Sequence, residues 1–80
     1  MNDNKENAAT LARMEEVKSL IKSLGENLEQ VRDIREKYEP GDRRASSADK
    51  LEDRIMEAMD EACTIHGYEL ATLAINGFKW

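Results

Sequence analysis

Cys63 and His66 have the most distinctive chemistry in this chain, since each residue type occurs once. Their spacing of three places both side chains on similar faces of a helix, with Met59 and Asp60 one turn earlier. Zinc and copper sites require three or four such ligands at defined geometry, and the chain offers only two soft candidates. The same pair lacks a glycine-rich oxyanion loop and a third orienting residue. We therefore predict no metal site here, but a small core thiol beside a half-exposed imidazole.

Neighbouring carboxylates are the other possible source of acid–base chemistry. Glu15 and Glu16 are adjacent, as are Asp60 and Glu61. Adjacent side chains on a helix diverge by about 100°, so these pairs cannot share a proton as a catalytic dyad does. No phosphate-loop motif occurs either. We predict that the chain is not an enzyme and requires no cofactor.

Basic residues gather around the one Pro-Gly dipeptide of the sequence, at positions 40 and 41. Arg43 and Arg44 would stand at the start of a helix, with Lys50 one turn on and Tyr38 before the turn. Helix N-termini attract anions, arginine forks match phosphate oxygens, and an aromatic ring can stack on a base. We predict Tyr38, Arg43, Arg44 and Lys50 as ligand-binding residues for a phosphate-bearing ligand. The alternative is that the arginines solubilise a loop and pair with acidic neighbours such as Asp42.

The elements that position these residues are two helices that fold back on each other at residues 39–44. Proline keeps its predecessor out of the helical region, and glycine accepts the left-handed angles of a sharp reversal. The apolar stripe of the first helix consists of Met14, Val17, Leu20, Ile21, Leu24, Leu28, Val31, Ile34 and Tyr38. That of the second consists of Ala48, Leu51, Ile55, Ala58, Ala62 and Ile65, with Met59 and Cys63 alongside. This periodicity predicts an all-α antiparallel helical hairpin with helices over about 8–38 and 43–76.

We expect a disordered segment over residues 1–7 and a single helical domain over residues 8–80. Three details stay open at this stage. Asn27 could fix the register between helices or rotate outward, and the second helix could be capped by Asp42 or by Ser46. Gly67 could break that helix or be tolerated within it, whereas Asn76-Gly77 is a plausible C-terminal stop.

The tail of the second helix is apolar nearly all the way round. It contains six large apolar residues, which we predict as an interface: Tyr68, Leu70, Leu73, Ile75, Phe78 and Trp80. A helix that is apolar on every side must be covered on every side, and two helices are too few to do so. We therefore expect homo-oligomerisation or a protein partner. An 80-residue chain is also short enough to gain stability from association.

The charge balance bounds the partners. Lys+Arg 12 against Asp+Glu 17 gives a net charge of −5, which disfavours direct DNA binding and anionic membrane surfaces. No apolar run is long enough to span a bilayer, and no signal-peptide core is present. The single cysteine permits no internal disulfide and suggests a reducing compartment. We predict a cytoplasmic protein.

Residues 40–58, PGDRRASSADKLEDRIMEA, resemble the C-terminal helix of the small phage anti-CBASS sponge proteins, whose hairpin domain is shared with a class of anti-Thoeris proteins. The similarity lies in Pro40, the arginines, Lys50-Leu51-Glu52 and Met56-Glu57-Ala58. It implies an all-helical hairpin that assembles into a symmetric oligomer and captures cyclic oligonucleotide signals. It also implies that Arg43 or Arg44 contacts phosphate.

Three functions follow as hypotheses. The first is a phage-type counter-defence protein that acts by binding, either as an oligomeric sponge of a cyclic nucleotide signal or as an inhibitor of a host defence protein. The second is a helical adaptor whose tail docks onto one protein partner, which includes anti-CRISPR-like action. The third is an acidic mimic of DNA.

Overall fold

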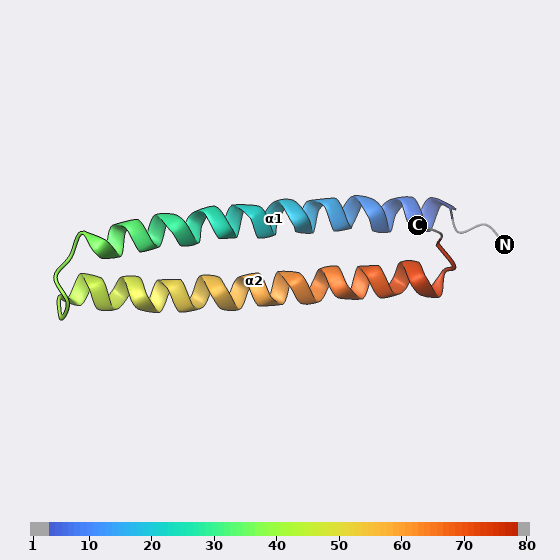
Figure 1. Cartoon of the computed structure of the whole chain (residues 1–80). Coiled ribbons are helices and arrows are strands. Elements are labelled where there is room, and N and C mark those ends of the chain that lie inside the picture. The colour runs from blue at the N-terminus through green and yellow to red at the C-terminus, as the bar shows by residue number, and fades with distance from the viewer. Residues whose placement is uncertain (1–3, 79–80) are drawn as a thin grey trace.

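The computed structural model describes residues 4–78, which form two antiparallel helices of equal length. Helix α1 spans Asn4–Glu36 and helix α2 spans Arg43–Ile75. The two helices pack side by side along their whole length and make a rod of 61 × 15 × 15 Å (Figure 1). The prediction of an all-α antiparallel hairpin is confirmed.

The reversal between the helices is a short turn around Gly41. The backbone N–H of Asp42 donates to the Glu39 carbonyl at 3.0 Å, and Gly41 adopts a φ of 93°, which favours glycine. Asp42 then caps α2, because its carboxylate accepts from the backbone N–H of Arg44 at 2.8 Å. Of the two predicted starts of the second helix, Asp42 is therefore the one used, and Ser46 lies inside the first turn.

The two helices meet along a seam in which shielded residues alternate by three and four. On α1 these residues are Asn7, Thr10, Met14, Val17, Ile21, Leu24, Leu28, Val31 and Arg35, followed by Tyr38 in the turn. On α2 they are Ala45, Ala48, Glu52, Ile55, Met59, Ala62, His66, Glu69 and Leu73, followed by Asn76 in the cap. Such spacing is the seven-residue repeat of a coiled coil. The seam is unusual in carrying polar residues at both ends and a histidine between.

Part of the predicted stripes is wrong, because several of their residues lie beside the seam and are exposed. On α1 these are Leu20 and Ile34, and on α2 they are Leu51, Ala58, Cys63 and Ile65. The seam of α2 runs one residue further on, through Glu52, Met59 and His66. Asn27 is likewise exposed, so it has rotated outward from the intramolecular seam.

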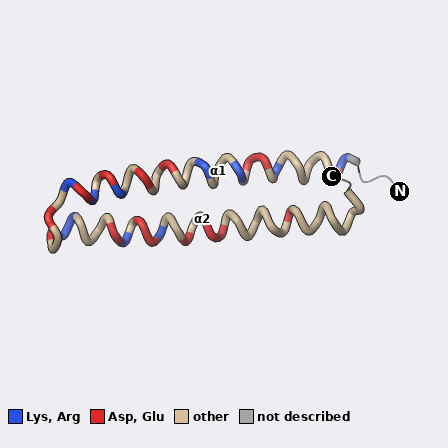
Figure 2. Tube along the Cα trace, viewed as in Figure 1, with Lys and Arg blue, Asp and Glu red and all other residues tan. Residues whose placement is uncertain are grey.

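Ion pairs tie the helices together along the rod. Near the turn, Arg35 pairs with Asp49, and Arg32 pairs with Glu52 at 3.4 Å. Figure 2 shows that Lys and Arg alternate with Asp and Glu along α1 and the first half of α2, whereas the second half of α2 carries few charges. Each pair joins residues at the same level of the hairpin and is therefore consistent with its register.

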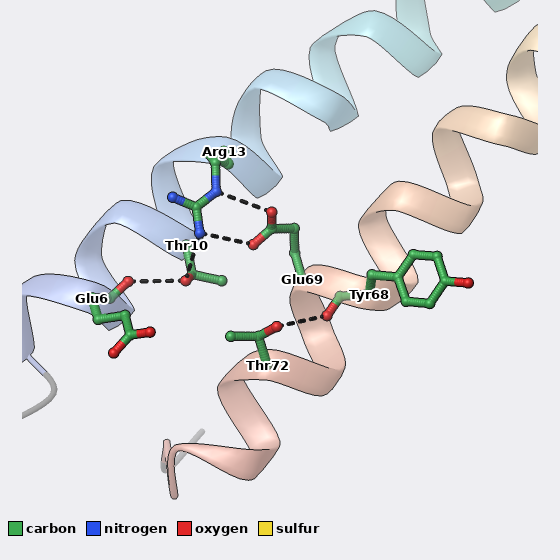
Figure 3. A network of polar contacts seen from close by, with 6 residues as sticks. All are labelled: Glu6, Thr10, Arg13, Tyr68, Glu69 and Thr72. Carbon is green, nitrogen blue, oxygen red and sulfur yellow. Dashed lines mark hydrogen bonds and ion pairs between the residues drawn. The ribbon is translucent and has the colours of Figure 1, made fainter.

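Polar contacts join the two helices at the end of the rod away from the turn. Arg13 donates two hydrogen bonds to the Glu69 carboxylate, at 3.0 and 3.1 Å, and a third to the Thr10 hydroxyl (Figure 3). The Asn76 side-chain amide donates to the Asn7 side-chain oxygen at 3.3 Å. Helix α1 begins at Asn4, earlier than predicted. Residues 1–3 of the predicted disordered segment lie outside the described residues.

Helix α2 runs through Gly67 without interruption and ends at Ile75. The cap at Asn76 and the positive φ of Gly77, 72°, make the stop that the sequence predicted. Within residues 4–78, neither helix has a stretch apolar enough to cross a bilayer.

Candidate binding groove at the turn

An open groove of about 300 Å³ lies between the two helices beside the turn. Its lining residues are Val31, Ile34, Tyr38, Arg43, Arg44, Ser47, Ala48 and Leu51. Three of the four predicted ligand-binding residues, Tyr38, Arg43 and Arg44, are thus brought together. The antiparallel register adds the apolar residues, because it sets Ile34 of α1 against Leu51 of α2.

Arg44 is held in place by its neighbours. Its guanidinium donates two hydrogen bonds to the Asp42 carboxylate, at 3.1 and 2.9 Å, and lies 4.5 Å from the centre of the Tyr38 ring. This hydrogen bonding, together with the bond from the Arg44 backbone N–H, lowers the pKa of Asp42 to about 2. The same pairing raises the pKa of Arg44. The alternative prediction, that the arginines pair with acidic neighbours, is therefore correct for Arg44.

The N-terminus of α2 is also occupied by the chain itself. The Asp42 carboxylate accepts from the Arg44 backbone N–H at 2.8 Å, and the Asp42 carbonyl accepts from the Ser46 N–H at 3.1 Å. A ligand anion would have to displace the Asp42 carboxylate to reach the Arg44 N–H. The predicted contribution of helix amides to anion binding is therefore small at this site.

Arg43 differs from Arg44, although the two are neighbours. It is exposed, and it makes no hydrogen bond or ion pair with any residue in the described part of the chain. Its guanidinium is therefore the cation of the groove that a ligand could engage without breaking an existing contact. Ser47 supplies a hydroxyl on the same lining, which the sequence prediction did not include.

Lys50, the fourth predicted ligand-binding residue, lies outside the groove. It lines a separate depression with Asp53, Arg54 and Glu57, where the opposite charges balance. A ligand held in the groove would meet Tyr38 and the arginines, whereas Lys50 lies beside the groove, in a further depression that shares Ser47 and Leu51 with it.

The predicted interface residues of the tail differ in their exposure. Leu73 is fully buried between the helices, where the sequence predicted contact with a partner. Tyr68, Leu70 and Ile75 are exposed, and Figure 3 shows the Tyr68 ring directed away from α1. Phe78 is half-buried, with its backbone N–H donating to the Leu73 carbonyl at 2.9 Å. Trp80 lies outside the described residues.

Cys63 and His66 do not form a site. Cys63 is exposed, so the predicted core thiol is wrong, whereas His66 is half-buried as predicted. The His66 Nε2 atom is buried and has no hydrogen-bond partner among residues 4–78. The same part of the chain holds no group of three His, Cys, Asp or Glu residues placed to bind a metal ion.

The geometry suits a ligand with a flat, partly apolar body and an anionic group. Comparison of the chain with protein-family models, with curated proteins and with solved structures finds no match. The function has to be argued from the groove and from the surface of the rod.

Proposed function

We propose that this chain is a non-catalytic binding protein whose turn groove captures a phosphate-bearing small molecule. The observation that carries the proposal is that Tyr38 and Arg43, which has no ion-pair partner among residues 4–78, line one partly apolar groove. An aromatic ring and a guanidinium are the groups that hold a nucleobase and a phosphate, respectively. A volume of about 300 Å³ lies at the lower end of the range for small-molecule pockets.

The ligand class proposed first is a cyclic nucleotide signal, the class implied by the resemblance of residues 40–58 to phage sponge proteins. In this role the chain is a counter-defence protein that sequesters the signal. In this proposal Arg43 engages a phosphate oxygen and Tyr38 presents its ring to a base. Arg44, which is itself held by Asp42, packs against the Tyr38 ring and keeps it in position. Capture requires no bond to be made or broken.

Titration calorimetry with cyclic di- and trinucleotides tests this function. The wild-type chain should bind one of them, and Arg43→Ala should weaken binding by about tenfold or more, because a charge-assisted contact to phosphate is lost. Arg54→Ala is the matched control, since Arg54 is an exposed arginine of α2 outside the groove. The proposal fails if no cyclic nucleotide gives heat of binding, or if Arg54→Ala weakens binding as much as Arg43→Ala.

The second candidate is a helical adaptor or inhibitor that binds a host protein. It is favoured by Tyr68 and Ile75, which are exposed seven residues apart on α2. Counter-defence activity that survives Arg43→Ala and is lost in Tyr68→Ala would favour this candidate over nucleotide capture. DNA mimicry has less support, because Figure 2 shows basic residues between the acidic ones along α1 and the first half of α2.

A further inference from the structure

One side of the rod carries a row of large apolar residues that the hairpin leaves uncovered. Leu20 and Ile34 of α1 are 49% and 42% exposed, and Leu51 and Ile65 of α2 are each 48% exposed. We call this row the apolar face. The register of the hairpin sets Leu20 level with Ile65, and Ile34 level with Leu51. Ile34 and Leu51 also line the turn groove. The apolar face thus consists of two apolar layers, separated along the rod by about 21 Å.

The layer between these two is small and uncharged. It consists of Asn27 and Ala58, both exposed. Leu20 precedes Asn27 by seven residues and Ile34 follows it by seven, and Leu51 and Ile65 are placed in the same way around Ala58. A two-fold axis through the Asn27–Ala58 layer therefore superimposes each apolar layer on the other. The apolar face is self-complementary, as a two-fold interface requires.

The surface area of the chain is large for its mass, which leaves room for an interface. A compact monomer of 9.1 kDa exposes about 4,900 Å², whereas this chain exposes 6239 Å². The excess of about 1,300 Å² exceeds the area of about 800 Å² that each partner buries in a standard interface. The radius of gyration of 17.9 Å, against about 12 Å for a compact chain of this length, reflects the same thin rod.

The flanks of the apolar face distinguish between two ways of docking a second copy. If the copy is antiparallel, α1 lies over α1 and α2 over α2, with Asn27 and Ala58 at the centre. Glu16 then lies within one residue of the level of Lys37 of the second copy. Arg54 likewise lies within one residue of the level of Glu61 of the second copy. Each opposite-charge pair occurs twice because the axis is two-fold.

The other arrangement sets the two turns at the same end, with α1 over α2 of the second copy. It brings no opposite charges together on the flanks, because Glu16 would lie near Tyr68 and Arg54 near Gln30. It also gathers Arg43 and Arg44 of both copies at one end of the assembly. Charge complementarity thus favours the antiparallel arrangement.

The opposite side of the rod is less suited to self-association. It carries Leu11, Met56 and Leu70, but Lys18, Arg32 and Asp49 lie on the same side. Arg32 there is engaged with Glu52 and Asp49 with Arg35. We infer that the apolar face is a homodimer interface, at which a second copy packs antiparallel across the Asn27–Ala58 layer to complete a four-helix bundle.

Cross-linking through single cysteines tests the axis directly. In a Cys63→Ser background, Asn27→Cys should form a disulfide with Asn27→Cys of a second copy, and Ala58→Cys should do the same. Ser19→Cys, on the outer surface of α1, is the control and should give no covalent dimer. Efficient cross-linking between Asn27→Cys and Ala58→Cys chains, without either homodimer, would mean that the turns lie at the same end and would overturn the antiparallel arrangement.

Sedimentation of matched variants tests the face. The full chain should sediment as a dimer, and Leu20→Glu should weaken dimerisation by about a hundredfold or more, because it buries unpaired charge at the interface. Met56→Glu is the control, since Met56 is 49% exposed, as Leu20 is, but lies on the opposite side. A wild-type monomer at millimolar concentration, or equal effects of the two variants, would overturn the inference. Because Ile34 and Leu51 line both the apolar face and the turn groove, the Leu20–Ile65 layer of a second copy would cover part of the groove, and dimerisation would compete with ligand binding. Leu20→Glu should therefore abolish dimerisation and leave ligand binding intact, whereas Arg43→Ala should weaken ligand binding and leave the dimer intact, so the two proposals can fail separately.

Discussion

Replacing Leu73 with alanine should destabilise the hairpin by about 3 kcal/mol. Leu73 has 0% exposure, so the substitution removes fully buried methyl groups and leaves a cavity between the helices. Leucine-to-alanine changes at such sites cost about 2–5 kcal/mol, through lost transfer free energy and the residual cavity. An 80-residue domain is stabilised by about 4–12 kcal/mol in total, so this one change removes a large part of its stability. The corresponding fall in melting temperature is about 12–24 °C.

Leu70→Ala is the matched control, because Leu70 is the same residue type three positions earlier and is 40% exposed. Its cost should be about 1 kcal/mol, since part of the side chain is already in water and no closed cavity forms. Helix propensity contributes little to either change, because leucine and alanine are both strong helix formers. Neither residue lies on the apolar face, so the comparison does not depend on dimerisation.

Urea denaturation followed by circular dichroism gives both free energies. Equal slopes against denaturant for the wild type and the two variants would show that the same surface is exposed on unfolding. If Leu70→Ala costs as much as Leu73→Ala, or if Leu73→Ala costs less than about 1 kcal/mol, the second half of α2 does not face α1 as described.

Three further changes test other parts of the hairpin, each by thermal unfolding or titration. Gly67→Ala should stabilise the hairpin by about 1 kcal/mol, because an added Cβ meets nothing within 4 Å. Gly41→Ala should destabilise it by about 1 kcal/mol, because Gly41 has a φ of 93°. Changes of the same sign for both variants would contradict the described backbone. His66→Leu should stabilise by about 1 kcal/mol, since the buried Nε2 lacks a partner in the described chain, and a loss of stability would reveal one. The pKa of the Asp42 carboxyl is lowered from 3.8 to about 2, so this group should contribute its full stabilisation when the pH is above its pKa in the unfolded chain. The contribution should be lost as the pH falls through about 2. An NMR titration that places the pKa of Asp42 near 4 would contradict this.

The turn and the general fold follow from the sequence, but the rotation of α2 does not. Two rows of heptad spacing run side by side on α2: Leu51, Ala58 and Ile65, and one position on, Glu52, Met59 and His66. Apolarity alone selects the first row, whereas in the structure the second row faces α1 and is half-buried. Which row faces α1 depends on the residues of α1; Glu52, for example, meets Arg32 only in the closed hairpin. A pattern read along one helix cannot contain this information.

Polar residues at the ends of the seam explain the earlier start of α1. Asn7 and Thr10 carry no apolar signal, yet Thr10 is buried and Asn7 accepts a hydrogen bond from Asn76. At the groove, Tyr38, Arg43 and Arg44 could be predicted because they are close in sequence. The contribution of Ile34 and Leu51 depends on the register, and the difference between Arg43 and Arg44 depends on which guanidinium Asp42 engages.

The contact between Asn7 and Asn76 sets both ends of the described chain at one pole of a rod 61 Å long, with the turn at the other. A domain fused to either end would therefore leave the turn unobstructed. In the antiparallel dimer the two copies point in opposite directions, so their fused domains would emerge at opposite poles. The dimer would then hold the two fused domains at opposite ends of a rigid rod.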